Sequence, residues 1–369
     1  MRVAVPRETK DSEFRVALTP AGAHELVDRG HEVVVEHDAG AGSSIADADY
    51  KEAGARIVAD AAEVWGTAEL LLKVKEPIGS EHRFLRADLV LFTYLHLAAS
   101  RPCTDALLSA GTTSIAYETV RTGDGRLPLL APMSEVAGRL APQVGAYHLM
   151  RSAGGRGVLM GGVPGAPGAD VVVLGAGVAG ANAIAIAAGM RAQLTVLDLD
   201  VDKLRVIDEQ YAGAVRTEYS TRLAVGEAVR NADLVIGAVL VPGAKAPTLV
   251  PNELVAQMRP GAVLVDIAID QGGCFADSRP TTHADPTYTV HDTVFYCVAN
   301  MPGAVPHTST RGLTNATLPY VLRLADRGWE AATEADPALA AGLSTHRGRL
   351  LSAEVAQAHG LPHEPLSGS

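Results

Sequence analysis

The clearest chemical signal in the chain is a glycine-rich turn that follows a run of apolar residues and opens a helical stretch. The turn reads Val171-Val-Val-Leu-Gly175-Ala-Gly177-Val-Ala-Gly180. In such a pattern the first glycine permits a tight turn, the second lets the backbone approach a diphosphate, and the third lets the helix pack closely on the strand. The helix N-terminus then offers N–H groups and a positive dipole to the anion. We therefore expect Gly175–Gly180, including Val178 and Ala179, to bind a dinucleotide.

A carboxylate follows the next expected strand at the spacing typical of dinucleotide-binding folds. The apolar run Leu194–Leu197 ends at Asp198, roughly 20 residues after the turn. This carboxylate can accept hydrogen bonds from ribose hydroxyls and would repel a 2′-phosphate, so the predicted cofactor is NAD rather than NADP. A glycine-rich turn without a cofactor is the alternative, which the flanking strand, helix and Asp198 disfavour.

Ligands of open α/β sheets bind outside the carboxyl ends of the strands. The expected strand ends in this half of the chain carry Val239-Leu240, Ile267–Asp270 and Asn300-Met301. We expect these residues to line the nicotinamide half of the site, although core packing is the alternative for the apolar ones and is equally plausible for Val239.

Strands alternate with helices in two series, and this alternation predicts parallel sheets. The first series has a helix at Thr19–Arg29 and strands at Arg2–Val5, Glu32–Glu36, Leu70–Val74, Leu89–Thr93 and Thr113–Ala116. A long helix is expected over Ser134–Arg151. The second series has strands at Val171–Leu174, Leu194–Leu197, Leu234–Ala238, Val263–Ile267 and Val294–Val298.

The predicted fold is α/β with two domains and a cleft between them. Residues after Pro306 are helical in pattern over 315–327 and too few to form a domain, so we expect them to pack on the N-terminal domain. The predicted substrate domain is therefore discontinuous, 1–127 and 306–369, and a Rossmann-type NAD-binding domain covers 128–305.

Composition excludes several classes of protein. The net charge of −11 over 369 residues disfavours nucleic-acid binding. Cys103, Cys274 and Cys297 form no Cys-x-x-Cys pair, which disfavours a zinc site or disulfide framework and favours a reducing cytoplasm. The longest apolar stretch, Val171–Met190, contains four glycines and is explained better by a βα unit than by a membrane span. The histidines form no short ligand motif, and we expect no catalytic metal ion.

Motifs along essentially the whole chain resemble the alanine dehydrogenase and nicotinamide nucleotide transhydrogenase family. They are Pro6-Arg-Glu-Thr-Lys10, Glu13-Phe-Arg-Val-Ala17, Thr19-Pro20, Leu72-Lys-Val-Lys75-Glu-Pro77, Thr93-Tyr-Leu-His96, Pro132-Met-Ser-Glu-Val-Ala-Gly138, Val265-Asp-Ile-Ala-Ile-Asp270-Gln-Gly-Gly273 and Val298-Ala-Asn-Met-Pro302. The resemblance implies reversible oxidation of L-alanine to pyruvate and ammonia with NAD, in a homo-hexamer.

Two other functions stay open at this point. In the soluble NAD(H)-binding subunit of a proton-translocating transhydrogenase a glutamate commonly precedes Gln-Gly-Gly, whereas this chain has Asp270, which favours the dehydrogenase. A non-catalytic NAD-binding regulator is the third possibility.

The resemblance also implies roles for individual residues. Arg15 suits a substrate carboxylate because its planar guanidinium pairs bidentately. Lys73 and Lys75 share a strand face, and the resemblance selects Lys75 for the substrate carboxylate or carbonyl oxygen. A lone histidine is usually structural, but the resemblance assigns His96 to acid–base work.

Asp270 is expected to orient water or ammonia, and Asp266 is a competing candidate with a more plausible structural role. The remaining implied positions are Glu118 and Met133 beside the substrate, Ser134 facing the cofactor, and Lys203 and Ser220 near the adenosine.

Overall fold

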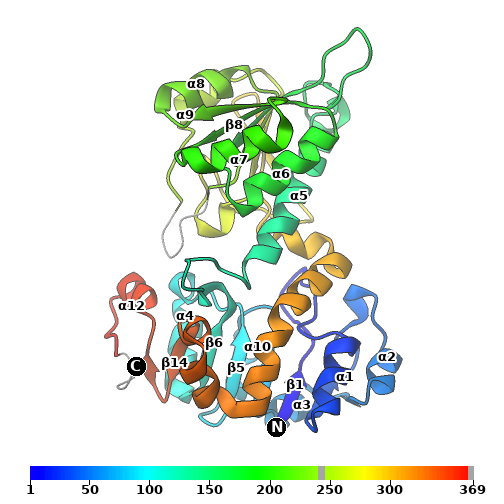
Figure 1. Cartoon of the computed structure of the whole chain (residues 1–369), viewed down its shortest axis with the longest axis vertical. Coiled ribbons are helices and arrows are strands. Elements are labelled where there is room, and N and C mark those ends of the chain that lie inside the picture. The colour runs from blue at the N-terminus through cyan, green and yellow to red at the C-terminus, as the bar shows by residue number, and fades with distance from the viewer. Residues whose placement is uncertain (240–245, 365–369) are drawn as a thin grey trace. The chain divides into compact units, whose positions relative to one another are not determined.

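The computed structural model describes residues 1–239 and 246–364, which form two compact α/β units (Figure 1). Unit 1 comprises Met1–Met133 and Val305–Ser369, and unit 2 comprises Ser134–Ala304. The predicted divisions were 127/128 and 305/306, and the units divide at 133/134 and 304/305. Each unit is built on one largely parallel sheet, which confirms the predicted α/β class.

The sheet of unit 1 has the strand order β15-β14-β6-β5-β4-β1-β2-β3. Its strands are β1 (Arg2–Val5), β2 (Glu32–Glu36), β3 (Arg56–Val58), β4 (Leu70–Leu72), β5 (Val90–Thr93), β6 (Thr113–Ala116), β14 (Leu343–His346) and β15 (Arg349–Leu350). The strands from β1 to β6 are parallel, and β14 pairs antiparallel with β6. The C-terminal segment is therefore part of the N-terminal sheet.

The helices of unit 1 are α1 (Pro20–Asp28), α2 (Asp47–Glu52), α3 (Ala61–Thr67), α4 (Arg101–Ala110), α10 (Pro306–Ala335), α11 (Pro337–Ala340) and α12 (Ala353–His359). Thr19 caps α1, because its hydroxyl accepts the Gly22 N–H at 3.3 Å. The C-terminal helical pattern extends well beyond 315–327, and α10 has a non-helical kink at Gly328, where φ is +75°.

The sheet of unit 2 has the order β12-β13-β11-β10-β7-β8-β9, and only β12 and β13 are antiparallel. Its strands are β7 (Asp170–Leu174), β8 (Gln193–Asp198), β9 (Val215–Tyr219), β10 (Leu234–Gly237), β11 (Val263–Asp266), β12 (Thr287–Val290) and β13 (Thr293–Tyr296). Its helices are α5 (Ala131–His148), α6 (Val178–Gly189), α7 (Val201–Tyr211), α8 (Arg222–Asn231) and α9 (Asn252–Val255).

Alternate residues of β7 enter two different cores in unit 2. Val171 and Val173 pack with the α6 residue Ile184, whereas Val172 and Leu174 pack with Val229 of α8. Helices α5, α6 and α7 cover one face of the sheet, and α8 and α9 cover the other (Figure 1). Because both faces are buried, the strands appear in sequence as continuous apolar runs.

Several predicted boundaries were wrong. The strand expected at Leu70–Val74 ends at Leu72, and the helix expected at Ser134–Arg151 runs from Ala131 to His148. A proline in the first turn removes no intrahelical hydrogen bond, so Pro132 is compatible with the earlier start. The strands missed by the sequence, β3, β9, β12, β14 and β15, are short or carry polar residues within them.

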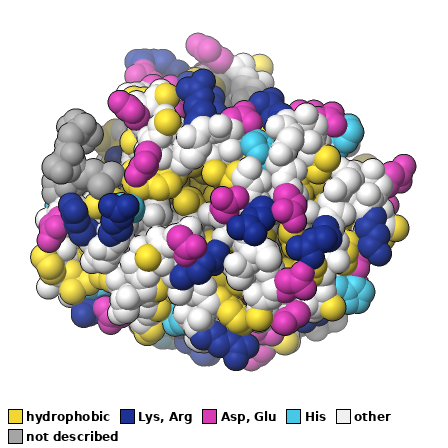
Figure 2. All heavy atoms as spheres, turned by 90° about the horizontal axis from the view of Figure 1, so that it is seen from below, with side chains coloured by type: hydrophobic (Ala, Val, Ile, Leu, Met, Phe, Trp, Pro, Cys, Tyr) yellow, Lys and Arg dark blue, Asp and Glu magenta, His cyan; other side chains and the backbone are white. Residues whose placement is uncertain are grey.

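Among the described residues, no helix has the length and apolar character needed to cross a membrane. On the face drawn in Figure 2, basic and acidic side chains are interspersed, and neither charge gathers in a large field.

The close approach of α6 to β7 depends on Gly180. An ideal Cβ at this position would lie 1.8 Å from the Gly175 carbonyl oxygen, whereas one at Gly189 on the same helix would meet nothing within 4 Å. We expect Gly180→Ala to cost about 1–3 kcal/mol, which corresponds to a fall of roughly 2–12 °C in Tm. Gly189→Ala is the matched control and should leave Tm unchanged or raise it slightly. Equal Tm values for the two variants, measured by calorimetry, would contradict this account.

Candidate active site

Three predicted substrate residues lie beyond the carboxyl ends of neighbouring strands in unit 1. Arg15 belongs to the segment after β1, Lys75 follows β4 by three residues, and His96 follows β5 by three residues. Since β1, β4 and β5 are adjacent and parallel, their carboxyl ends meet at one edge of the sheet. Sites of open α/β sheets form at this edge.

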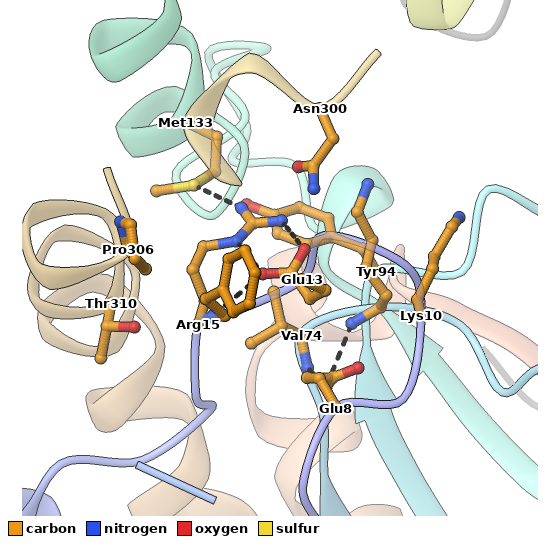
Figure 3. Close-up of polar contacts among 12 residues, drawn as sticks. Glu8, Lys10, Glu13, Arg15, Val74, Tyr94, Met133, Asn300, Pro306 and Thr310 are labelled. Carbon is orange, nitrogen blue, oxygen red and sulfur yellow. Dashed lines mark hydrogen bonds and ion pairs between the residues drawn. The ribbon is translucent and has the colours of Figure 1, made fainter. Parts of the chain in front are cut away.

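Arg15 is 2% exposed and is held by Glu13 (Figure 3). The Arg15 Nε–H donates to Glu13 Oε1 at 2.7 Å, and Nη2 donates to Oε2 at 2.5 Å. Burial opposes the charge of the guanidinium, but the hydrogen bonds and charge of Glu13 outweigh it and raise the pKa of Arg15. Arg15 therefore stays cationic in a buried position.

Met133 lies against the opposite side of the same guanidinium. Arg15 Nη1 approaches Met133 Sδ at 3.0 Å (Figure 3). Because Glu13 takes the Nε–Nη2 edge of the guanidinium, a second carboxylate would pair with the Nη1–Nη2 edge beside Met133. A hollow of about 540 Å³ adjoins this segment and is lined by residues 7–15, Asp38, Ala39 and Gly42.

The two neighbouring lysines have different surroundings. The Lys73 Nζ donates to Glu8 Oε2 at 3.0 Å and to Glu81 Oε1 at 2.9 Å, and its side chain is 1% exposed. Burial opposes its charge, but the two carboxylates raise the pKa of Lys73. Lys73 therefore belongs to a buried ion-pair cluster with Glu8 and Glu81.

Lys75 is also buried, at 7% exposed. Glu8 Oε1 accepts the backbone N–H of Val74 at 2.6 Å and that of Lys75 at 3.4 Å. One carboxylate thus joins the Lys73 ammonium to the backbone that carries Lys75. Strand β4 ends at Leu72, so both lysines lie just beyond it, and the bound glutamates distinguish them.

His96 is half-buried and has a left-handed backbone, with φ +47° and ψ +38°. Its imidazole stacks on the Tyr94 ring at a centroid distance of 5.8 Å. The backbone N–H of His96 donates to Glu118 Oε1 at 2.6 Å. Glu118, which the resemblance places beside the substrate, therefore binds the backbone of the histidine.

The glycine turn of unit 2 has the conformation that a dinucleotide site requires. Gly175 has φ +100°, which favours glycine, and an ideal Cβ on Gly177 would meet nothing within 4 Å. Helix α6 begins at Val178, so Val178 and Ala179 form its first turn and direct unpaired N–H groups outward. These features fit the diphosphate of NAD.

Asp198 ends β8 and faces the same turn. Its Oδ2 accepts the Ala176 N–H at 2.6 Å, and its Oδ1 accepts the Asp200 N–H at 2.8 Å. The Ser220 N–H donates to the Asp198 carbonyl at 3.0 Å, so Ser220 lies at the neighbouring strand end. Lys203 is exposed on α7, 3.6 Å from Asp200. The Asp198 carboxylate, which binds the Ala176 N–H, is positioned to meet a ribose next to the glycine turn.

Asp266 and Asp270, the two candidates for orienting water or ammonia, differ in burial. Asp266 is fully buried, and its carboxylate accepts the N–H groups of Ala268 at 3.0 Å and Cys274 at 2.9 Å and the Ser278 hydroxyl at 2.5 Å. Burial raises the pKa of this carboxyl. Asp270 is exposed on the loop that Asp266 holds.

The other predicted cofactor residues also belong to unit 2. Val239 packs against the turn, because an ideal Cβ on Gly175 would lie 3.0 Å from Val239 Cγ2. Ile267 follows β11 directly, and its N–H donates to the Gly237 carbonyl at 2.9 Å. The remaining positions are Ser134 near the start of α5, Asn300 and the buried Met301 after β13, and Leu240, which lies outside the described residues.

In the part of the chain that the structure describes, one group of side chains has metal-ligating atoms close together: His37, Asp38 and Asp47. It is largely exposed and lies in unit 1 beside α2. The prediction that no metal ion takes part in catalysis is not tested by it.

Sequence reasoning missed the glutamates that hold the predicted residues. Glu8 and Glu13 were noted only as parts of family motifs, and Glu118 only as a neighbour of the substrate. A carboxylate just beyond a strand end was the available signal, but its backbone partners depend on loop conformation, which spacing does not specify.

Family models match both halves of the chain. The N-terminal domain of the alanine dehydrogenase/PNT family matches residues 4–137, and the C-terminal domain matches residues 141–353. The chain is 67% identical over 368 residues to an alanine dehydrogenase of Mycobacterium tuberculosis, covering 100% of this chain and 99% of that protein. It is 56% identical to an alanine dehydrogenase of Halomonas elongata, with 98% of each covered.

Solved structures agree with these relatives. An L-alanine dehydrogenase structure matches with a TM-score of 0.94 and 49% identity, covering 98% of this chain and 99% of that chain. A transhydrogenase structure from Sinorhizobium meliloti matches with a TM-score of 0.79 and 27% identity, covering 96% and 99%. This chain belongs to the alanine dehydrogenase/PNT family.

Proposed function

We propose that the protein is an NAD-dependent L-alanine dehydrogenase. The observation that carries this proposal is that buried Arg15, buried Lys75 and half-buried His96 all follow adjacent parallel strands of one sheet, in a chain 67% identical to an alanine dehydrogenase. A guanidinium, an ammonium and an imidazole suit a carboxylate, a carbonyl oxygen and a mobile proton, respectively.

The overall reaction is L-alanine + NAD⁺ + H₂O → pyruvate + NH₄⁺ + NADH + H⁺. When bound, NAD accepts the Cα hydride at nicotinamide C4. Gly175–Gly180 and Asp198 would hold its diphosphate and adenosine ribose, with Lys203 and Ser220 near the adenosine. Ser134, Val239, Ile267, Asn300 and Met301 would line the rest of its site, and we expect the same of Leu240, which lies outside the described residues.

Each substrate residue has one role in this proposal. Arg15 binds the substrate carboxylate through its Nη1–Nη2 edge, with Met133 bordering the methyl side. Lys75 donates to the carboxylate or carbonyl oxygen. His96 takes a proton from the water that attacks the imine carbon and returns one when the carbinolamine expels ammonia. Asp270 orients that water or ammonia and stabilises positive charge on the imine nitrogen.

Two other functions are compatible with parts of the molecule. An NAD(H)-binding transhydrogenase subunit is favoured by the 27% identical structure, but that likeness is weaker than the one to alanine dehydrogenases. A non-catalytic NAD-binding regulator would not need the buried Arg15 and Lys75. Assembly as a homo-hexamer in the cytoplasm completes the proposal, and all three cysteines are buried free thiols, as suits a reducing compartment.

We expect the purified protein to form NADH from NAD and L-alanine, with equimolar pyruvate, and to give a higher equilibrium yield at alkaline pH because the reaction releases a proton. D-Alanine is the control and should give no NADH. Absence of any rate with L-alanine, while NAD still binds by calorimetry, would instead support a transhydrogenase subunit or a regulator.

Substitution of Lys73 should lower mainly stability, and substitution of Lys75 should lower mainly activity. Lys73→Met leaves Glu8 and Glu81 buried without their cation, and we expect a cost of about 3–5 kcal/mol, or roughly 6–20 °C in Tm. Lys75→Met should lower kcat/KM for alanine by about 10²-fold, since a charged hydrogen bond is worth about 1.5–3 kcal/mol, with a smaller change in Tm. A larger Tm loss in Lys75→Met would contradict this division of roles.

Asp198 is expected to set the cofactor preference. Asp198→Asn keeps an oxygen for the Ala176 N–H but removes the charge that repels a 2′-phosphate. The ratio of kcat/KM for NAD to that for NADP should fall by about 10–100-fold, the equivalent of one charged hydrogen bond. Asp202→Asn, an exposed charge change on α7, is the control and should leave the ratio within about twofold. An unchanged ratio in Asp198→Asn would show that another group excludes NADP.

A further inference from the structure

We infer that Glu118 is the positioning residue for His96 and acts through the backbone rather than on the substrate. This inference rests on the proposed function, because it concerns the geometry of the proposed acid–base group. Glu118 lies in the turn Tyr117–Thr119, directly after β6. Since β6 pairs in parallel with β5, Glu118 and His96 emerge from neighbouring strands at the same edge of the sheet.

Two consecutive backbone N–H groups converge on this one carboxylate. The His96 N–H donates to Glu118 Oε1 at 2.6 Å, and the Leu95 N–H lies 3.3 Å from Oε1 and 3.2 Å from Oε2. Successive N–H groups that point to one side form a concave anion site. Here the anion is the side chain of the protein itself.

The convergence explains why His96 can keep a conformation that L-residues avoid. A left-handed backbone costs about 1–2 kcal/mol for a residue with a Cβ, and it persists only where surrounding interactions fix it. A hydrogen bond to an ionised acceptor is worth about 1.5–3 kcal/mol, enough to offset this cost. At φ +47° the chain reverses from β5 into the short helical turn Leu97–Ala99, which sets the direction of the imidazole.

The ring of His96 is restrained separately by Tyr94. The two rings are nearly parallel, at 10°. The Tyr94 hydroxyl donates to the Leu129 carbonyl at 2.5 Å, and its ring meets Tyr117 edge to face at 5.1 Å. Tyr94 therefore limits where the ring can lie, and Glu118 fixes the backbone from which the ring projects.

The test compares Glu118→Ala, Glu118→Gln and the control Thr119→Val. Thr119 lies in the same turn, and its hydroxyl donates to the Ala116 carbonyl at 3.3 Å without touching the histidine segment. Small displacements of a catalytic group cost about 10²-fold, so we expect Glu118→Ala to lower kcat by roughly 30–100-fold and KM for alanine to change less than about threefold. Glu118→Gln keeps one acceptor oxygen, so the fall in log kcat should be at most half of the fall in Glu118→Ala. Thr119→Val should leave kcat within about twofold.

A double-variant cycle separates positioning from direct contact with substrate. If Glu118 acts through His96, adding Glu118→Ala to His96→Ala should lower kcat by less than about twofold further. A full additional loss, or a KM increase larger than the kcat decrease, would overturn the inference in favour of a substrate contact. Equal kcat for wild type and Glu118→Ala would overturn it as well.

Hydrogen exchange provides a readout that does not need turnover. A peptide covering residues 94–100, followed by mass spectrometry, should exchange faster in Glu118→Ala than in wild type and Thr119→Val, because two amide protons lose their acceptor. If wild type has no alanine activity, the proposed function fails and this comparison still decides the role of Glu118. Unchanged exchange in Glu118→Ala would overturn the inference whatever the activity.

Discussion

The structure depends on carboxylates that accept hydrogen bonds from backbone N–H groups just beyond the ends of parallel strands. Glu8 holds the backbone of Val74 and Lys75, and Glu118 holds that of Leu95 and His96. In unit 2, Asp266 holds the loop that carries Asp270. A parallel sheet leaves N–H groups unpaired where its strands end, and a buried carboxylate satisfies several of them at once. Loops thereby gain defined shapes where the proposed chemistry requires fixed side chains.

This arrangement assigns the charged residues to two tasks. Residues with a buried carboxylate partner, such as Arg15 and Lys73, keep their charge because the partner offsets the desolvation that burial imposes. Asp270, by contrast, lies exposed on a supported loop. The same chemical group thus serves as scaffold at Asp266, where it is buried and hydrogen-bonded, and remains accessible at Asp270.

The α/β class, the glycine turn and most central strands could be predicted from the sequence, because buried parallel strands are continuous apolar runs and the turn needs glycine for steric reasons. Strands β9 and β14 could not be predicted, because polar residues interrupt their apolar pattern. In β9 these are Arg216 and Glu218, and in β14 they are Ser344 and Thr345. Spacing alone could not choose between Lys73 and Lys75, because it does not record that Glu8 and Glu81 bind the Lys73 ammonium. The partners of Glu8 and Glu118 depend on tertiary contacts between segments far apart in sequence, and no local pattern records such contacts.

The antiparallel pairing of β14 with β6 has a consequence for synthesis on the ribosome. Ala116 ends β6 and Leu343 begins β14, 227 positions later. At translation rates of roughly 5–20 residues per second, β14 is therefore synthesised about 10–45 s after β6. Throughout that interval the nascent chain presents an open β edge, the feature that chaperones shield and that seeds aggregation. Unit 2 is encoded without interruption between the two partners and can complete its fold before the first-made sheet closes.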